Sequence, residues 1–312
     1  MVVASAFYFP SADQKTLIHV NQWTPLGEPP KGVVQIAHGI AEYGARYAPF
    51  ARFLAENGYV VTAHDHLGHG LSCRPDGPRL FFAETGGWQL AVDDIASLHR
   101  RMAGLYPEVP YFLFGHSMGS FLTRTYLTRR PTPLAGALLC GTGHQSRLLL
   151  AAGRRMVRRE MARLGPEAYS ERINHLVFGA YNRPFAPNRT AYDWISANPD
   201  NVDAYLADPL CGGRATLALF ADLLEGIALV TDPRQIRKMD PTLPVFFLSG
   251  DQDPVGDMGK GVDRACAAFR AAGLTQVTEK LYHGLRHEIL NEKSSRFIYR
   301  DVLNWLEERR RA

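Results

Sequence analysis

Residues 111–119 place a serine between two glycines directly after an apolar run, and they read Tyr111-Phe112-Leu113-Phe114-Gly115-His116-Ser117-Met118-Gly119. A stretch with helical character, Phe121–Arg129, follows this segment. The pattern predicts a sharp strand-to-helix turn that holds Ser117 in a strained backbone conformation with its hydroxyl exposed. Side chains at positions 115 and 119 would collide with neighbouring backbone at such a bend. Ser117 is therefore the candidate nucleophile.

A serine nucleophile needs a histidine base, and the base needs an orienting acid. In enzymes with this turn the chain order is serine, acid, histidine. Asp251 and Asp253 follow one later apolar strand, and His283 and His287 follow the next. Both segments lie past strand carboxyl ends, where open α/β sheets bind their ligands. Spacing alone leaves the two aspartates open, whereas the break at Gly284 gives His287 a longer reach than His283.

Two backbone N–H donors for a tetrahedral oxyanion can also be placed. The apolar strand 32–37 ends in the segment His38-Gly39-Ile40-Ala41-Glu42. A glycine directly after a buried strand lets the next N–H point toward the pocket, and acyl transfer needs two such donors. The natural pair is the N–H of Ile40 and the N–H of Met118. Such a site needs no cofactor.

Four segments of this chain also match a known family: HGIAEYGARY (38–47), DHLGHGLS (65–72), GHSMG (115–119) and GDQDP (250–254). With them the chain resembles the monoacylglycerol lipase and lysophospholipase branch of the α/β-hydrolase superfamily, also grouped with serine aminopeptidases. The resemblance covers nearly the whole chain. It implies a serine hydrolase of lipid-like carboxylic monoesters that uses Ser117, His287 and Asp253. The family's acid lies three residues after a strand-ending glycine, and Ile40 and Met118 match its oxyanion donors.

Strand and helix signals alternate from about residue 15 to 140 and resume after 232, which predicts a mostly parallel sheet with crossover helices. The expected strands are Leu17–Val20, Val33–Ala37, Tyr59–Ala63, Tyr111–Phe114, Gly136–Cys140, Val245–Ser249 and Thr278–Leu281. One expected helix buries Trp88, Ala91, Val92, Ile95, Leu98 and Met102. The last helix, Ser294–Arg309, is expected to bury Phe297, Ile298, Val302, Trp305 and Leu306. The α/β-hydrolase core would comprise residues 1–143 and 233–312, with a helical cap inserted at 144–232.

The inserted segment 144–232 lacks clear strands and would roof the serine, where it would exclude water and shape an acyl pocket. Its candidate acyl-chain walls are Leu219, Phe220, Leu223 and Leu224, for which plain packing inside the cap is an equal alternative. Its arginines are opposed only by Glu160, and they are Arg147, Arg154, Arg155, Arg158, Arg159 and Arg163. These arginines could contact anionic lipid transiently. A solvated face over an apolar stripe is favoured, because amphipathic helices are common on surfaces; the stripe is Leu150, Val157, Met161 and Leu164.

Composition narrows the class further. With 46% hydrophobic and 21% charged residues, the chain can bury a large core, and its net charge of +4 is too slight to indicate nucleic acid. A run of about 18 apolar residues and a signal peptide are both absent from the sequence, so a cytoplasmic location is expected. The cysteines are Cys73, Cys140, Cys211 and Cys266, and they show no metal-like pairing.

The histidines at 38, 64, 66, 69 and 116 have no carboxylate-rich partner motif, so hydrogen bonding within loops is expected rather than a metal site. Asp65 is expected to accept loop N–H groups.

Two other classes of function stay open. An aminopeptidase or arylamidase would use the same triad and would need an acidic cluster in the cap for the α-amino group. The candidates for that cluster are Asp200, Asp203, Asp208, Asp222 and Glu225. A non-catalytic binding protein on this fold would be expected to lose a triad member, and here every candidate is present.

Overall fold

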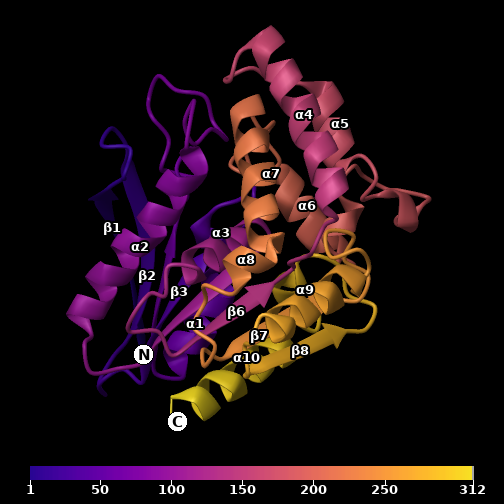
Figure 1. Ribbon diagram of the computed structural model, residues 1–312. Helices are drawn as coiled ribbons and strands as arrows, with labels where there is room; N and C mark the ends of the chain where they lie inside the picture. Colours follow the sequence, from indigo (N-terminus) through magenta and orange to yellow (C-terminus); the bar gives the residue numbers. More distant parts are fainter. Residues whose placement is uncertain (311–312) are drawn as a thin grey trace.

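A single eight-stranded sheet organises the computed structural model, which describes residues 1–310 (Figure 1). Its strand order is β1-β2-β4-β3-β5-β6-β7-β8; β2 runs antiparallel to β1 and β4, and all other neighbours are parallel. The strands are β1 (Val2–Pro10), β2 (Leu17–Pro25), β3 (Gly32–Ala37), β4 (Tyr59–His64), β5 (Tyr111–His116), β6 (Gly136–Cys140), β7 (Val245–Gly250) and β8 (Val277–Tyr282). The mostly parallel sheet is thus confirmed, and all seven expected strands are present. Strand β1 was not expected.

Helices cover both faces of the sheet. They are α1 (Ala48–Glu56) and α10 (Ser295–Arg309) on one face, with α2 (Gly87–Leu105), α3 (Met118–Leu127) and α9 (Lys260–Ala271) on the other. Side chains of a strand alternate between the two faces, so neighbours such as Val33 and Val34 belong to different clusters of the core. Because both faces are covered, the central strands are mostly apolar, and their few polar residues, such as Gln35 and Thr62, are buried as well.

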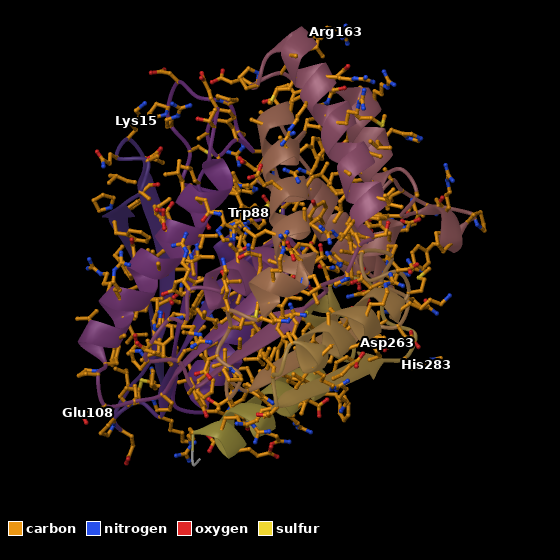
Figure 2. All side chains as sticks on the ribbon, viewed as in Figure 1. Lys15, Trp88, Glu108, Arg163, Asp263 and His283 are labelled. Carbon is orange, nitrogen blue, oxygen red and sulfur yellow. The ribbon has the colours of Figure 1, made fainter. Side chains whose placement is uncertain are left out.

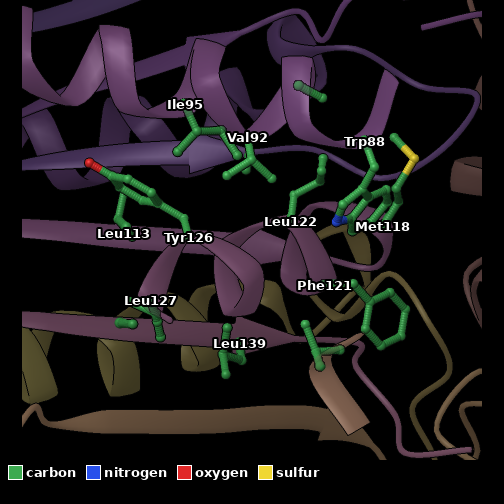
Figure 3. Close-up of a cluster of buried hydrophobic side chains, with 14 of the residues drawn as sticks. Trp88, Val92, Ile95, Leu113, Met118, Phe121, Leu122, Tyr126, Leu127 and Leu139 are labelled. Carbon is green, nitrogen blue, oxygen red and sulfur yellow. The ribbon is translucent and has the colours of Figure 1, made fainter. Parts of the chain in front are cut away.

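The larger cluster lies between the sheet and helices α2 and α3 (Figure 3). All six expected residues of α2 are buried there, and Trp88 also donates a 3.0 Å hydrogen bond to Thr125 of α3. Burying each large apolar side chain stabilises the fold by about 1.5–3 kcal/mol. The packing fixes α3, and therefore the turn that precedes it, against the sheet.

The expected buried face of α10 is wrong at one position. Ile298, Val302, Trp305 and Leu306 are buried, but Phe297 is 57% exposed. Successive helical residues are about 100° apart, so Phe297 points away from the stripe that its neighbour occupies. Its ring instead lies 4.9 Å from Nζ of Lys280, in a cation–π contact on β8.

The segment between β6 and β7 is helical and extends beyond the sheet (Figure 1). It contains α4 (Arg147–Leu164), α5 (Glu171–Phe178), α6 (Pro199–Ala207), α7 (Leu217–Thr231) and the short α8 (Pro233–Ile236). Helix α7 packs on α2 and α3, and α4 packs on α7. Leu150 and Val157 are the buried residues of α4, whereas Leu164 is 41% exposed, so its apolar stripe is narrower than expected.

One arginine joins both ends of this segment to α3. Arg124 is fully buried, and its guanidinium donates to the carbonyls of Gly143 (2.8 Å) and Val230 (2.9 Å) and to the hydroxyl of Thr142 (3.2 Å). Burial lowers the pKa of Arg124 to about 9. Because Gly143 precedes α4 and Val230 lies in the last turn of α7, the same side chain holds the chain where helices α4 to α7 begin and where they end.

None of the helices described in residues 1–310 combines the length and the hydropathy that a membrane-spanning helix needs.

Candidate active site

Ser117 occupies the turn between β5 and α3 with backbone angles φ +52° and ψ −120°. L-residues rarely adopt a positive φ, and such strain is typical of functional turns. Its N–H donates to the carbonyl of Cys140 (3.0 Å), and its own carbonyl accepts the hydroxyl of Ser120 (2.6 Å). A Cβ added at Gly119 would lie 2.0 Å from the carbonyl oxygen of Ala37. The expected collision is therefore present, and only glycine fits at position 119.

Asp253 and His287 form a buried pair. Nδ1 of His287 lies 2.9 Å from Oδ2 of Asp253, and both side chains are at most 5% exposed. The carboxylate also accepts hydrogen bonds from the Ser249 hydroxyl (3.1 Å) and the Val255 N–H (2.9 Å). These donors fix the carboxylate, so Nδ1 of the imidazole donates and Nε2 remains as the basic nitrogen.

The rival residues form a second pair at the surface. Asp251 accepts hydrogen bonds from Nδ1 of His283 (2.8 Å) and from the Gly284 N–H (2.8 Å). The His283 side chain is 98% exposed, and Figure 2 shows it at the margin of the molecule. The structure thus brings Asp253 together with His287 in the interior and Asp251 together with His283 in solvent.

The ring of His287 lies beside the serine turn. It packs on the ring of His116, the residue before Ser117, with centroids 4.7 Å apart. A Cβ added at Gly141 would meet both rings, at 3.0 Å from Cε1 of His287 and 3.2 Å from Cδ2 of His116. The indole of Trp194, from the inserted segment, lies 5.2 Å from the His287 ring. His287 is therefore enclosed between the turn and this indole.

The segment after β3 touches Ser117. A Cβ added at Gly39 would lie 3.1 Å from Cβ of Ser117, so the Gly39–Ile40 peptide borders the serine. Met118 opens α3, where the first N–H groups of a helix have no acceptor within the helix. Ile40 and Met118 thus flank Ser117 from two different elements.

A buried ionic network, which sequence reasoning missed, surrounds these residues. It comprises Glu42, Arg46, His116 and Glu288. Burial by itself would raise the pKa of Glu42, but the hydrogen bond from His116 and the charge of Arg46 hold it well below its usual value. Burial opposes the charged form of His116, yet the hydrogen bond and the charge of Glu42 raise its pKa. The sequence signals were the placement of Glu42 and Arg46 in the 38–47 motif and of His116 in the 115–119 motif.

Of the remaining motif histidines, His38, His66 and His69 hold loops together as expected, whereas the expectation is wrong for buried His64, neither of whose ring nitrogens has a hydrogen-bond partner in the described part of the chain. Nε2 of His38 accepts the N–H of His66 (2.9 Å), and Nδ1 of His69 lies 3.0 Å from the carbonyl of Leu67. Burial lowers the pKa of His69 to about 3. Asp65 accepts the N–H groups of Gly44 (2.7 Å) and Leu71 (2.8 Å), as expected. Among residues 1–310 no group of three or more metal-ligating side chains is placed to hold a metal ion.

The candidate acyl-chain walls lie on α7. Leu219 and Phe220 are fully buried, Leu223 is buried, and Leu224 packs at the edge of the same cluster. That cluster also contains Met118, so the interior of the inserted segment is continuous with the serine turn.

This sheet, with a strained serine turn after its fifth strand and an acid–histidine pair at the ends of β7 and β8, defines an α/β-hydrolase. More specifically, the chain belongs to the serine aminopeptidase S33 family, whose model matches residues 28–294, and it is a serine hydrolase. The resemblance that the sequence motifs indicated is confirmed.

Named relatives cover almost the whole chain. A monoacylglycerol lipase of Mycolicibacterium smegmatis is 29% identical over 287 residues, which cover 91% of this chain and 90% of that protein. A monoglyceride lipase of Mus musculus is 30% identical over 293 residues, covering 92% and 86%. Among solved structures, a thermostable carboxyl esterase of Bacillus coagulans superposes with a TM-score of 0.91 at 26% identity, over 98% of both chains.

Proposed function

We propose that this protein hydrolyses carboxylic esters with one fatty acyl chain, of the monoacylglycerol or lysophospholipid type, through Ser117, His287 and Asp253. The observation that carries the proposal is the buried Asp253–His287 pair, 2.9 Å long, beside a serine held at φ +52°. The alternative pair, Asp251 with His283, lies at the surface, where the His283 side chain is 98% exposed.

The proposed reaction has two steps. His287 removes the proton of Ser117 as the hydroxyl oxygen attacks the ester carbonyl, and Asp253 stabilises the imidazolium. The N–H groups of Ile40 and Met118 receive the oxyanion, and loss of one such donor typically costs about 3–4 kcal/mol in the transition state. His287 then protonates the departing alcohol, and water activated by the same base hydrolyses the acyl-enzyme.

The inserted segment supports a lipid substrate. We propose residues 144–232 as a cap on a core of residues 1–143 and 233–312, with Leu219, Phe220, Leu223 and Leu224 as walls for an acyl chain. Each methylene that such a site buries contributes about 0.8 kcal/mol. Relatives named monoacylglycerol lipase and monoglyceride lipase, which match about nine-tenths of the chain, support the single-chain class of substrate.

The acidic residues favour an ester over an aminoacyl substrate because several of them already have polar partners. Asp208 accepts the hydroxyl of Tyr43 (2.7 Å), Asp203 pairs with Arg189 (2.6 Å), and Glu225 lies 3.9 Å from Arg154. Asp222 is packed against Gly87 in α2, and Asp200 lies in the first turn of α6. Asp203, Asp208 and Glu225 are thus engaged by other side chains, which leaves them less available to an α-amino group.

Helix α4 supports a transient contact with anionic lipid surfaces. Its arginines Arg154, Arg155, Arg158 and Arg159 line an open groove of about 510 Å³, and Leu148 is 86% exposed at the start of the helix. Phosphatidylglycerol vesicles should bind the protein in low salt and release it at about 0.5 M salt, because exposed charges are then screened. Vesicles of phosphatidylcholine alone are the control. The protein is proposed to be cytoplasmic apart from such contacts, which fractionation of the source cells tests.

Two measurements test the proposed function. A fluorophosphonate probe should label the wild type once and leave Ser117→Ala unlabelled; labelling of that variant at another serine contradicts the nucleophile. With p-nitrophenyl esters, kcat/KM should rise from acetyl to medium-chain acyl groups, because each added methylene is desolvated. Monoacylglycerols and lysophospholipids should then be cleaved faster than triacylglycerols or aminoacyl-arylamides. A flat chain-length profile, or arylamides cleaved faster than esters, contradicts the lipid-ester proposal.

A further inference from the structure

Glu42 anchors the turn that carries Ile40. Its Oε1 accepts hydrogen bonds from the Gly39 N–H (2.6 Å), the Tyr47 hydroxyl (2.8 Å) and Nδ1 of His116 (3.1 Å). The carboxylate therefore orients the Gly39–Ile40 peptide. It also orients His116, which is the residue directly before Ser117.

Arg46 connects this carboxylate to a second one. Its Nη1 donates to Oε2 of Glu42 (2.9 Å) and also to Oε1 of Glu288 (2.6 Å), while its Nη2 donates to Oε2 of Glu288 (2.8 Å). The contact with Glu288 is bidentate, a geometry that fixes orientation as well as distance. The side chains of Arg46, Glu42 and Glu288 are at most 10% exposed, so solvent screens this pairing little.

Glu288 is the residue after His287, and it is held from three sides. Besides Arg46, Asn201 of α6 donates to its Oε2 (2.7 Å), and its own N–H donates to the carbonyl of Ile195 (2.7 Å). The backbone that carries His287 therefore has its position set by the guanidinium and by the inserted segment.

We propose that Arg46 is a positioning residue that fixes the loop of His287 relative to the turn of Ile40, through Glu288 and Glu42. The inference rests on the proposed roles of Ser117, His287 and Ile40 and deepens them. The base and one oxyanion donor come from loops 247 residues apart in sequence, after β8 and β3, and the guanidinium hydrogen-bonds a carboxylate of each loop. His116 adds a second connection, with Nδ1 3.1 Å from Oε1 of Glu42 and Nε2 3.3 Å from the carbonyl oxygen of His287. Arg46 touches neither the nucleophile nor the base, so it acts on the reaction only through the geometry of the two loops.

The test compares Arg46→Lys, Glu288→Gln and the double variant. Lysine at position 46 keeps the positive charge but loses the two Nη donors that contact Glu288. Glutamine at position 288 keeps the size of the side chain but loses its negative charge. A misplacement of about 1 Å can cost about 10²-fold, so each single variant should lower kcat on a medium-chain p-nitrophenyl ester by roughly 10–100-fold, with KM changed less than about threefold. The double variant should be no slower than the slower single variant, because both changes break one contact.

Active-site titration with a fluorophosphonate separates positioning from folding. A merely structural role would reduce the number of sites that become labelled and leave the rate per labelled site unchanged. The proposal expects full labelling at a slower rate per site. Arg129→Lys, in the exposed pair between Arg129 and Asp93, is the matched control and should keep wild-type kcat.

The results that would overturn the positioning role differ from those that would overturn the proposed function. Per-site kcat within threefold of wild type, additive losses in the double variant, or a raised KM at unchanged kcat would each overturn the positioning role. Should Arg46→Lys not fold, Glu288→Gln decides the question by the same criteria. Ser117→Ala belongs in the same series: if it stays active, the proposed function fails and the positioning role fails with it. If Ser117→Ala is inactive while Arg46→Lys is normal, only the positioning role fails.

Discussion

Replacing Gly119 by alanine should damage catalysis through one methyl group. The added Cβ would lie 2.0 Å from the carbonyl oxygen of Ala37, and real Cβ atoms essentially never approach closer than 3.0 Å. The end of β3 and the start of α3 must therefore separate by about 1 Å. Because Ile40 follows β3 and Met118 opens α3, both proposed oxyanion donors move. Overpacking costs about 1–3 kcal/mol of stability, and misplacing the donors by this amount should lower kcat at least about 10²-fold.

The assay is steady-state hydrolysis of a medium-chain p-nitrophenyl ester, together with a denaturant titration. Gly104→Ala is the matched control, because a Cβ at this exposed position of α2 meets nothing within 4 Å. That variant should keep wild-type kcat and gain about 0.5–1 kcal/mol, as glycine costs stability inside a helix. A Gly119→Ala enzyme with kcat within threefold of wild type would refute the reasoning.

The two acidic candidates and the ionic network give further expectations. Asp253→Asn should lower kcat by on the order of 10⁴-fold, whereas Asp251→Asn should lower it less than about tenfold; steady-state kinetics with reversed severities would identify Asp251 as the acid. The loss of folding stability in Glu42→Gln should depend on pH, because the pKa of His116 is raised by Glu42. The stability from this pair is fully present below the ordinary pKa of 6.5 and is lost as pH rises through the raised value. Urea unfolding should therefore show a larger cost of Glu42→Gln at about pH 6 than at about pH 9, and an equal cost at both would contradict the charged pairing. An NMR titration of the His116 signal should likewise report a lower pKa in Glu42→Gln than in the wild type. Arg46 and Glu288 are present in both proteins, so the comparison isolates the effect of the Glu42 carboxylate.

Much of the fold could be predicted because its signals are local. Apolar runs such as Gly136–Cys140 end at turn residues, and the stripe of α2 repeats at helical spacing, so both elements lie where expected. Strand β1 was missed because it is an edge strand with mostly exposed side chains, and only Phe9 of its residues is buried and apolar. Phe297 was misplaced because hydrophobicity alone does not reveal a surface cation–π partner on another element.

The candidate site likewise has parts that a local sequence pattern predicts and parts that it does not. The serine turn is formed by one continuous segment, residues 115–119, so its strained backbone angles can be predicted from two glycines and a serine. The choice between Asp253 and Asp251 depends on which side chain faces the interior at the end of β7, which spacing left open and only the family motif indicated. The contact between Arg46 and Glu288 joins residues 242 apart in sequence, and no local pattern encodes it.

The buried guanidinium of Arg124 has a consequence for engineering the molecule. Besides the hydroxyl of Thr142, its acceptors are the backbone carbonyls of Gly143 and Val230, which any amino acid provides. The junctions at Gly143 and Val230 therefore tolerate a change of sequence between them as long as the chain returns to the same two points. A chimera that exchanges residues 144–229 for the equivalent segment of another family member, and keeps Arg124, retains the original docking points. Because the proposed cap shapes the acyl pocket, we expect the substrate range to move with the exchanged segment, while the parent keeps its own sheet and serine turn.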